Sequence, residues 1–176
     1  MPGCAHIAGS LHMTTQTTVL TETLKALRSD LCWCSYNIFS TQYHTVDVIT
    51  HDESAAVFSW KVESLKDYWG CILNTLIWPE GDVKGHIPEL VVDGGGDMTL
   101  IIHDDKKAED LFFKDGTIPD TSSTDNAEFN ILQTIIKRQI EGGDMDSWKN
   151  CQYVFGIFWG ELNGSSPYVH NGEDMH

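Results

Sequence analysis

The sequence is poor in basic side chains. Its 176 residues include 11 lysines and arginines against 26 aspartates and glutamates, which gives a formal net charge of −15. A chain this acidic offers no basic patch for phosphate backbones or anionic lipids, so we expect no nucleic-acid partner and no membrane partner. The excess of acid is typical of a solvated surface, and we assign it no binding role.

Long apolar runs and ordered cysteine spacings are also absent. No stretch reaches the roughly 18 apolar residues of a membrane span, and the N-terminal segment lacks the basic and apolar regions of a signal peptide. We therefore expect a cytoplasmic location. The cysteines are odd in number and show no zinc-ligand spacing, which favours reduced core residues over disulfides. They are Cys4, Cys32, Cys34, Cys71 and Cys151.

The hydrophobic pattern alternates short strands with helices along a length that fits one domain. It predicts strands at 5–8, 31–38, 55–60, 89–92 and 151–158, and helices at 15–27, 41–49, 64–78 and 127–141. We interpret 98–103 as helical or extended, 106–113 as a short helix, and 78–88 and 116–126 as loops. This alternation predicts an α/β fold of three layers, a doubly wound parallel sheet with helices on both faces.

Two polar strings lie where a predicted strand gives way to a predicted helix. One runs from Leu11 to Thr17, and the other runs from Asn37 to Gln42. In an open α/β sheet, ligands bind outside the carboxyl ends of the strands. The two strings therefore predict a small-molecule pocket at one edge of the sheet.

The same strings carry a resemblance to a known family. The first reads Ile-Ala-Gly-Ser-Leu-His-Met-Thr from Ile7 to Thr14, and the second reads Asn-Ile-Phe-Ser-Thr-Gln from Asn37. Further along, Trp60-Lys61, Tyr68-Trp69 and Gly95-Gly96-Asp97 follow in the family's order. Together they resemble the Rossmann-like substrate-binding domain of the S-adenosylhomocysteine hydrolases.

The resemblance extends over residues 4–157 and implies a domain organisation and an activity. Residues 107–148 are similar to an insertion of plant, protozoan and many bacterial members, and we expect 158–176 to be a divergent tail that does not pack. The family reversibly hydrolyses S-adenosylhomocysteine to adenosine and homocysteine. In that family NAD supplies the redox chemistry, and the protein orients the substrate and moves protons.

Residue-by-residue matching implies three roles in the first string. His12 matches a catalytic histidine near the ribose, where imidazole suits proton transfer because it titrates near neutral pH. Thr14 matches a substrate-contacting threonine, and Gln16 matches the position that reads the adenine edge, which an amide can pair with. The structural alternatives are a hydrogen-bonded histidine for His12 and a helix cap for Thr14.

Further matches place Ser40, Thr41 and Asp93 among the substrate-binding residues. For Ser40 and Thr41 the alternative is an ordinary turn between a strand and a helix. Asp93 matches an acid that flanks the family's catalytic aspartate, whose own position is taken by Gly94. Glycine cannot accept a proton, and loss of a general acid or base typically slows a reaction by about 10²- to 10⁴-fold.

Other departures concern the cofactor. The sequence has no G-x-G-x-x-G fingerprint, so we expect no cofactor domain in this chain and no binding of NAD by the chain alone. The family's ribose-binding glutamate falls on Gly160, and Arg28 stands where the family has a turn glycine.

Three hypotheses remain. The first is a truncated, inactive fragment or degenerate paralogue. The second is a module that binds adenosine or S-adenosylhomocysteine weakly, or that regulates an intact family subunit by docking on it. The third is a non-functional translation product. We expect a monomer, because the family assembles largely through the cofactor domain.

Overall fold

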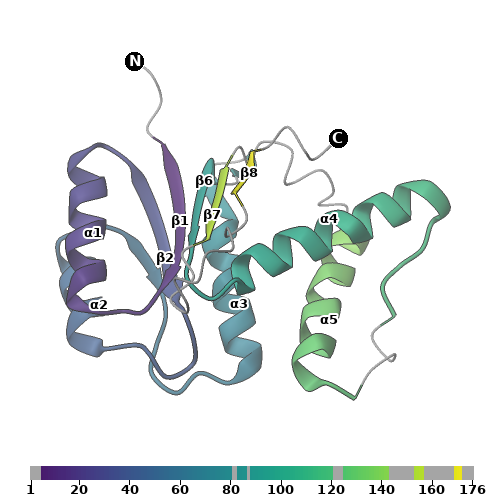
Figure 1. The fold of residues 1–176 in the computed structure, drawn as a ribbon, viewed down its shortest axis with the longest axis horizontal. Coiled ribbons are helices and arrows are strands. Elements are labelled where there is room, and N and C mark those ends of the chain that lie inside the picture. The colour runs from purple at the N-terminus through teal and green to yellow at the C-terminus, as the bar shows by residue number, and fades with distance from the viewer. Residues whose placement is uncertain are drawn as a thin grey trace.

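A six-stranded sheet forms the centre of the protein (Figure 1). The computed structural model describes residues 5–80, 83–86, 88–120, 125–142, 153–156 and 169–171. The strand order is β3-β2-β1-β6-β7-β8. All neighbours are parallel except β8, which runs antiparallel to β7. The strands are β1 (His6–Leu11), β2 (Asp30–Ser35), β3 (Ala56–Phe58), β6 (Leu90–Asp93), β7 (Tyr153–Gly156) and β8 (Val169–Asn171).

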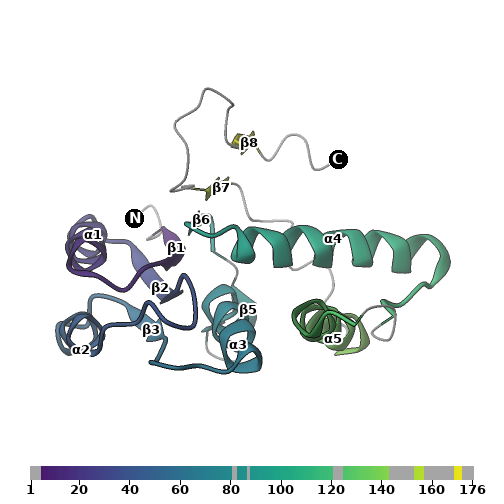
Figure 2. The same cartoon turned by 60° about the horizontal axis from the view of Figure 1, so that its bottom comes forward.

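Helices cover both faces of this sheet, which confirms the predicted α/β fold. Figure 2 shows α1 and α2 on one side and α3 on the other, with α4 and α5 reaching away from the sheet. The helices are α1 (Thr15–Ala26), α2 (Tyr43–His51), α3 (Leu65–Leu76), α4 (Asp97–Asp115) and α5 (Ala127–Gly142). The chain winds outward from β1 through β2 to β3 and then returns to β6, so the winding reverses between β1 and β6.

Alternation along the strands builds two cores, because successive side chains of a strand point to opposite faces. Trp33 of β2 packs with Met13 and Ile49 on the side of α1 and α2. The next residue, Cys34, belongs to the larger cluster with α3, α4 and α5. The three cysteines that the structure describes, Cys32, Cys34 and Cys71, are buried and not disulfide-bonded, as expected. Cys4 and Cys151 lie outside the described residues.

Burial also makes two of these cysteines chemically inert. Desolvation raises the pKa of the Cys34 thiol to about 12, and it raises that of Cys71 to about 12 as well. Because the thiolate is the nucleophile and the metal ligand, both residues act as core side chains.

The start of α3 shows how local sequence sets an element. Ser64 is the N-cap: its hydroxyl accepts from the Asp67 N–H at 3.2 Å. The Asp67 carboxylate accepts in return from the Ser64 N–H at 3.2 Å. This capping box pairs two N–H groups that the helix leaves without partners.

Two predictions of local structure were wrong. Residues expected to form a loop at 78–88 include the antiparallel strands β4 (Trp78–Glu80) and β5 (Val83–His86). The two pieces expected at 98–103 and 106–113 are one helix, α4. Asp104, which lies between the two pieces, supports the helix, since its carboxylate lies 3.6 Å from the Lys107 ammonium about one turn along.

Smaller differences concern α4, α5 and the C-terminal residues. The proposed insertion at 107–148 begins inside α4 without a structural break. On α5, Leu132, Ile136 and Ile140 are buried, whereas Phe129 is 39% exposed. Residues 169–171 of the expected tail form β8. The rest of that segment lies outside the described residues, so its lack of packing stays a prediction.

Backbone strain at Val62 gives a stability prediction. Val62 has a left-handed φ of +63°, which disfavours any β-branched residue, and its side chain is 72% exposed. We expect Val62→Gly to raise the free energy of unfolding by about 1 kcal/mol in urea titrations, because glycine adopts this φ without steric cost. The matched control is Val19→Gly in the interior of α1, which should lower stability. Equal losses in both variants would contradict the prediction.

Arg28 also has a left-handed φ, of +67°. That backbone conformation favours glycine, which accords with the prediction that Arg28 occupies a turn-glycine position.

Candidate functional site

A cleft opens at the carboxyl ends of β1 and β6, where the winding of the sheet reverses. Ser10 and Asp93 are register partners at these ends, and the Gly94 N–H donates to the Ser10 carbonyl at 2.9 Å. The cleft has a volume of about 540 Å³, within the range of small-molecule pockets. It is lined by Leu11, His12, Thr14, Gln16, Thr17, Leu20, Tyr36 and Gly94. Reversal points of this kind are where open α/β sheets bind ligands.

The loop from β1 to α1 presents His12 and Thr14 to the cleft. Met13 between them is fully buried and anchors the loop in the core. The His12 carbonyl accepts from the Thr14 N–H at 2.9 Å and from the Thr17 hydroxyl. Thr14 is the N-cap of α1 by position, but its side chain makes no capping hydrogen bond. A backbone hydrogen bond and the Thr17 hydroxyl therefore fix this turn, and the Thr14 hydroxyl is not used by the helix.

Four polar side chains in the cleft make no hydrogen bond to any residue that the structure describes. They are those of His12, Thr14, Gln16 and Tyr36. Thr14 and Tyr36 are half-buried, whereas His12 and Gln16 are exposed, and polar groups that are not exposed normally find partners within the protein. An array of polar groups without protein partners, set in a partly apolar cleft, is suited to binding a polar ligand.

The second polar string lies beside this cleft but does not line it. The Ser40 hydroxyl lies 2.6 Å from the Ser35 hydroxyl, and the Thr41 hydroxyl lies 2.5 Å from that of Ser59. Thr41 is buried. The Ser40 bond stays within β2 and the loop that follows it, and the Thr41 bond joins this loop to the end of β3, as in the structural alternative. Ligand contact by Ser40 and Thr41 stays a prediction.

The Asp93 carboxylate forms hydrogen bonds within the turn that leads into α4 and with the first turn of that helix. It is 1% exposed. One carboxylate oxygen accepts from the N–H groups of Gly95 and Gly96, at 3.2 and 3.0 Å. The other accepts from the N–H and the hydroxyl of Thr99, both at 2.8 Å. A substrate-binding role for Asp93 stays a prediction, since four donors already occupy its oxygens.

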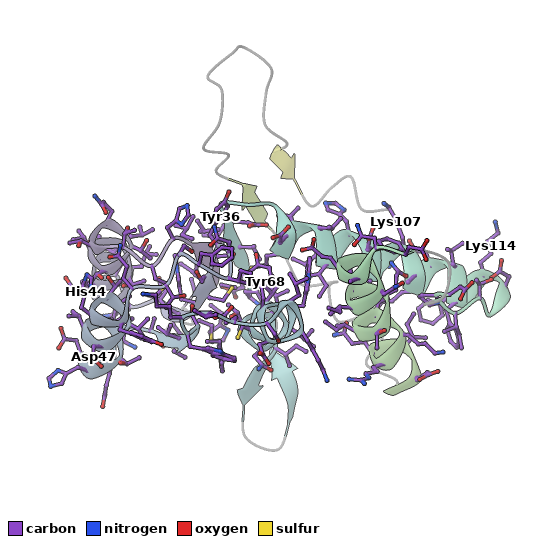
Figure 3. The ribbon with its side chains drawn as sticks, turned by 90° about the horizontal axis from the view of Figure 1, so that it is seen from below. Tyr36, His44, Asp47, Tyr68, Lys107 and Lys114 are labelled. Atoms are coloured by element: carbon purple, nitrogen blue, oxygen red, sulfur yellow. The ribbon has the colours of Figure 1, made fainter. Side chains whose placement is uncertain are left out.

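Sequence reasoning missed Tyr36, although it directly precedes the second polar string. Its ring lies against the His12 imidazole, with centroids 4.3 Å apart and planes tilted by 55°. Figure 3 shows Tyr36 and Tyr68 in the middle of the molecule, far from His44 on α2 and from Lys114 on α4. The signal in the sequence was the position of Tyr36 at the end of a strand.

Tyr68 and Asp97 form a hydrogen-bonded pair next to the backbone of Tyr36. The Tyr68 hydroxyl lies 2.8 Å from the Tyr36 carbonyl and 2.7 Å from the Asp97 carboxylate. Burial raises the pKa of the Tyr68 hydroxyl and, separately, that of the Asp97 carboxyl. The phenol therefore stays protonated, and its single O–H proton is shared between the Tyr36 carbonyl and the Asp97 carboxylate.

The glycine turn before α4 does not offer a site for the pyrophosphate of NAD. A dinucleotide pyrophosphate binds at free N–H groups of a helix N-terminus. At the start of α4, the N–H groups of Gly95, Gly96 and Thr99 all donate to Asp93. The part of the chain that the structure describes also holds no cluster of side chains that would bind a metal ion. None of its helices has the length and apolar character needed to cross a membrane.

Comparisons with known proteins identify the family of this chain. The family model for S-adenosyl-L-homocysteine hydrolase matches residues 3–161. Adenosylhomocysteinase of Solanum lycopersicum is 48% identical over 153 residues, and that of Triticum aestivum is 54% identical over 133 residues. These matches cover 87% and 76% of this chain but only 30% and 26% of the two relatives. The chain belongs to the S-adenosyl-L-homocysteine hydrolase family.

Proposed function

We propose that the cleft binds the adenosine part of S-adenosylhomocysteine, as the substrate-binding portion of an adenosylhomocysteinase. The observation that carries this proposal is the set of polar side chains at the reversal point of the sheet, those of His12, Thr14, Gln16 and Tyr36, which make no hydrogen bond to any described residue. Membership of the family supports the choice of ligand. The reaction that we propose for the whole protein is the family's reversible, NAD-dependent hydrolysis, in the cytoplasm.

Each side chain of the cleft has a chemical counterpart in adenosine. The Gln16 amide carries both donors and an acceptor, which match the edge of an adenine base. The Thr14 hydroxyl and the His12 imidazole can both donate to and accept from ribose hydroxyls. Leu11 and Leu20 supply the apolar wall that a planar base requires.

We further propose that this chain binds its ligand without catalysing its hydrolysis. Gly94 lines the cleft but offers no carboxylate to accept or return a proton. A Cβ atom at this position would lie 2.9 Å from Leu11 Cδ2 and 3.3 Å from the Ser10 carbonyl oxygen. The cleft is therefore packed around glycine, so that the surrounding atoms would need to shift to admit an aspartate.

The test is thermal unfolding of the chain with and without excess adenosine. A ligand that binds only the folded state raises the unfolding midpoint. We expect such a rise for the wild type, and we expect Gln16→Ala to weaken binding about ten-fold or more because hydrogen bonds to the base are lost. Gln133→Ala on α5 makes the same substitution outside the cleft and should bind like the wild type. A cooperative transition that adenosine does not move would refute the proposed function.

A further inference from the structure

The Tyr36 ring fills the space between His12 and the glycine turn. The ring centroid lies 4.3 Å from that of the His12 imidazole. On the side of the turn, Cβ atoms placed on Gly94 and Gly95 would lie 3.5 and 2.8 Å from its ring carbons. The turn therefore has room for Tyr36 only because glycine stands at position 95.

The backbone of Tyr36 is fixed on both sides of its Cα atom. Its N–H donates to the Leu11 carbonyl at 3.2 Å, next to His12 in the chain. Its carbonyl accepts from the Tyr68 hydroxyl of α3 at 2.8 Å. Tyr68 is itself buried, so it ties this position to the core.

His12 lacks comparable support of its own. Its side chain is exposed, and neither ring nitrogen forms a hydrogen bond with any of the described residues. A partnerless imidazole samples several rotamers, and fixing a side chain upon binding reduces the affinity for a ligand. A ring held against it restricts that freedom before the ligand arrives, and aromatic contacts of this geometry are favourable.

We propose that Tyr36 is a positioning residue that holds the His12 imidazole at the mouth of the cleft. Gly94, which lines the same cleft, has no carboxylate that could hold the imidazole instead. The consequence for adenosine affinity rests on the proposed function, whereas the held imidazole is a property of the free protein. Freezing one side chain in advance corresponds to about a three- to ten-fold gain in affinity.

The test combines NMR of the histidine side chains with adenosine titration. The His12 ring resonances are assigned from their loss in His12→Gln. In the wild type we expect them to be displaced from free-histidine positions by the ring current of Tyr36. Tyr36→Leu should return them towards those positions and weaken adenosine binding about three- to ten-fold relative to Tyr36→Phe, which keeps the ring and should preserve the displacement. Tyr68→Phe removes the tether but keeps the Tyr36 ring, and it should reduce the displacement.

The outcomes separate this proposal from the proposed function. Undisplaced His12 resonances in the wild type would overturn it, whether or not adenosine binds. Unchanged adenosine affinity in a folded Tyr36→Leu variant would also overturn it. A displaced imidazole that responds to Tyr36→Leu, in a protein that binds no adenosine, would support the positioning role and refute the proposed function instead.

Discussion

Asp93→Ala is expected to lower the free energy of unfolding by about 4 kcal/mol. The carboxylate accepts from four donors in and after the turn, namely three N–H groups and one hydroxyl. Hydrogen bonds to a charged group contribute about 1.5–3 kcal/mol each, and their donors would be left without partners when the acceptor is removed. Urea titration followed by tryptophan fluorescence measures this loss.

Two further variants show where the effect of Asp93 originates. Asp47→Ala changes an exposed aspartate on α2 and should alter stability by less than about 0.5 kcal/mol. Asp93→Asn keeps the shape but turns an amide N–H towards groups that are themselves donors, so it should fall between the wild type and Asp93→Ala. Wild-type stability in Asp93→Ala would refute the structural role and leave the carboxylate available for a ligand.

Gly9→Ala is expected to cost about 3 kcal/mol of stability. Gly9 of β1 is the register partner of Trp33 in β2. A Cβ atom on Gly9 would lie 2.4 Å from two ring carbons of Trp33, whose side chain is fully buried. Since the interior is closely packed, the indole cannot move aside without displacing its neighbours. Thermal and urea unfolding both report the loss.

The control for Gly9→Ala is the same substitution at a glycine whose added Cβ atom would contact no other atom. Gly70 lies inside α3, and a Cβ atom there would meet nothing within 4 Å. Gly70→Ala should therefore raise stability by about 0.5–1 kcal/mol, through helix propensity alone. Adding Trp33→Leu to Gly9→Ala should cost less than the sum of the two single changes, because the smaller side chain removes the clash. Equal stabilities of the two glycine variants would contradict the prediction.

The layered fold could be predicted from the sequence because its elements have strong local patterns. Ser64 begins α3 as a cap, and the apolar alternation of β2 directs Trp33 and Cys34 to opposite faces. The hairpin of β4 and β5 was missed because glycine, proline and charged residues in that segment are also typical of loops. The continuity of α4 was missed because its charged middle turn, around Lys106, has no apolar periodicity.

The candidate site was predicted in part. His12, Thr14 and Gln16 meet in one cleft because they occupy a short loop and the first turn of the helix behind it. Ser40 and Thr41 occupy a similar position in the chain, yet their hydroxyls are bonded within the protein. Residue type and spacing do not reveal whether a hydroxyl already has a partner, since that depends on groups distant in the sequence.

The sequence by itself determined the alternating elements, the family, the buried cysteines and the loops that carry the cleft. These follow from local periodicity, capping and turn chemistry, which act over a few residues. Only the tertiary structure decided which polar groups are free, because pairing depends on strands and helices that meet from separate parts of the chain. Tyr36 shows this most clearly: its neighbours His12, Tyr68 and Gly95 come together only when β1, α3 and β6 pack around the end of β2.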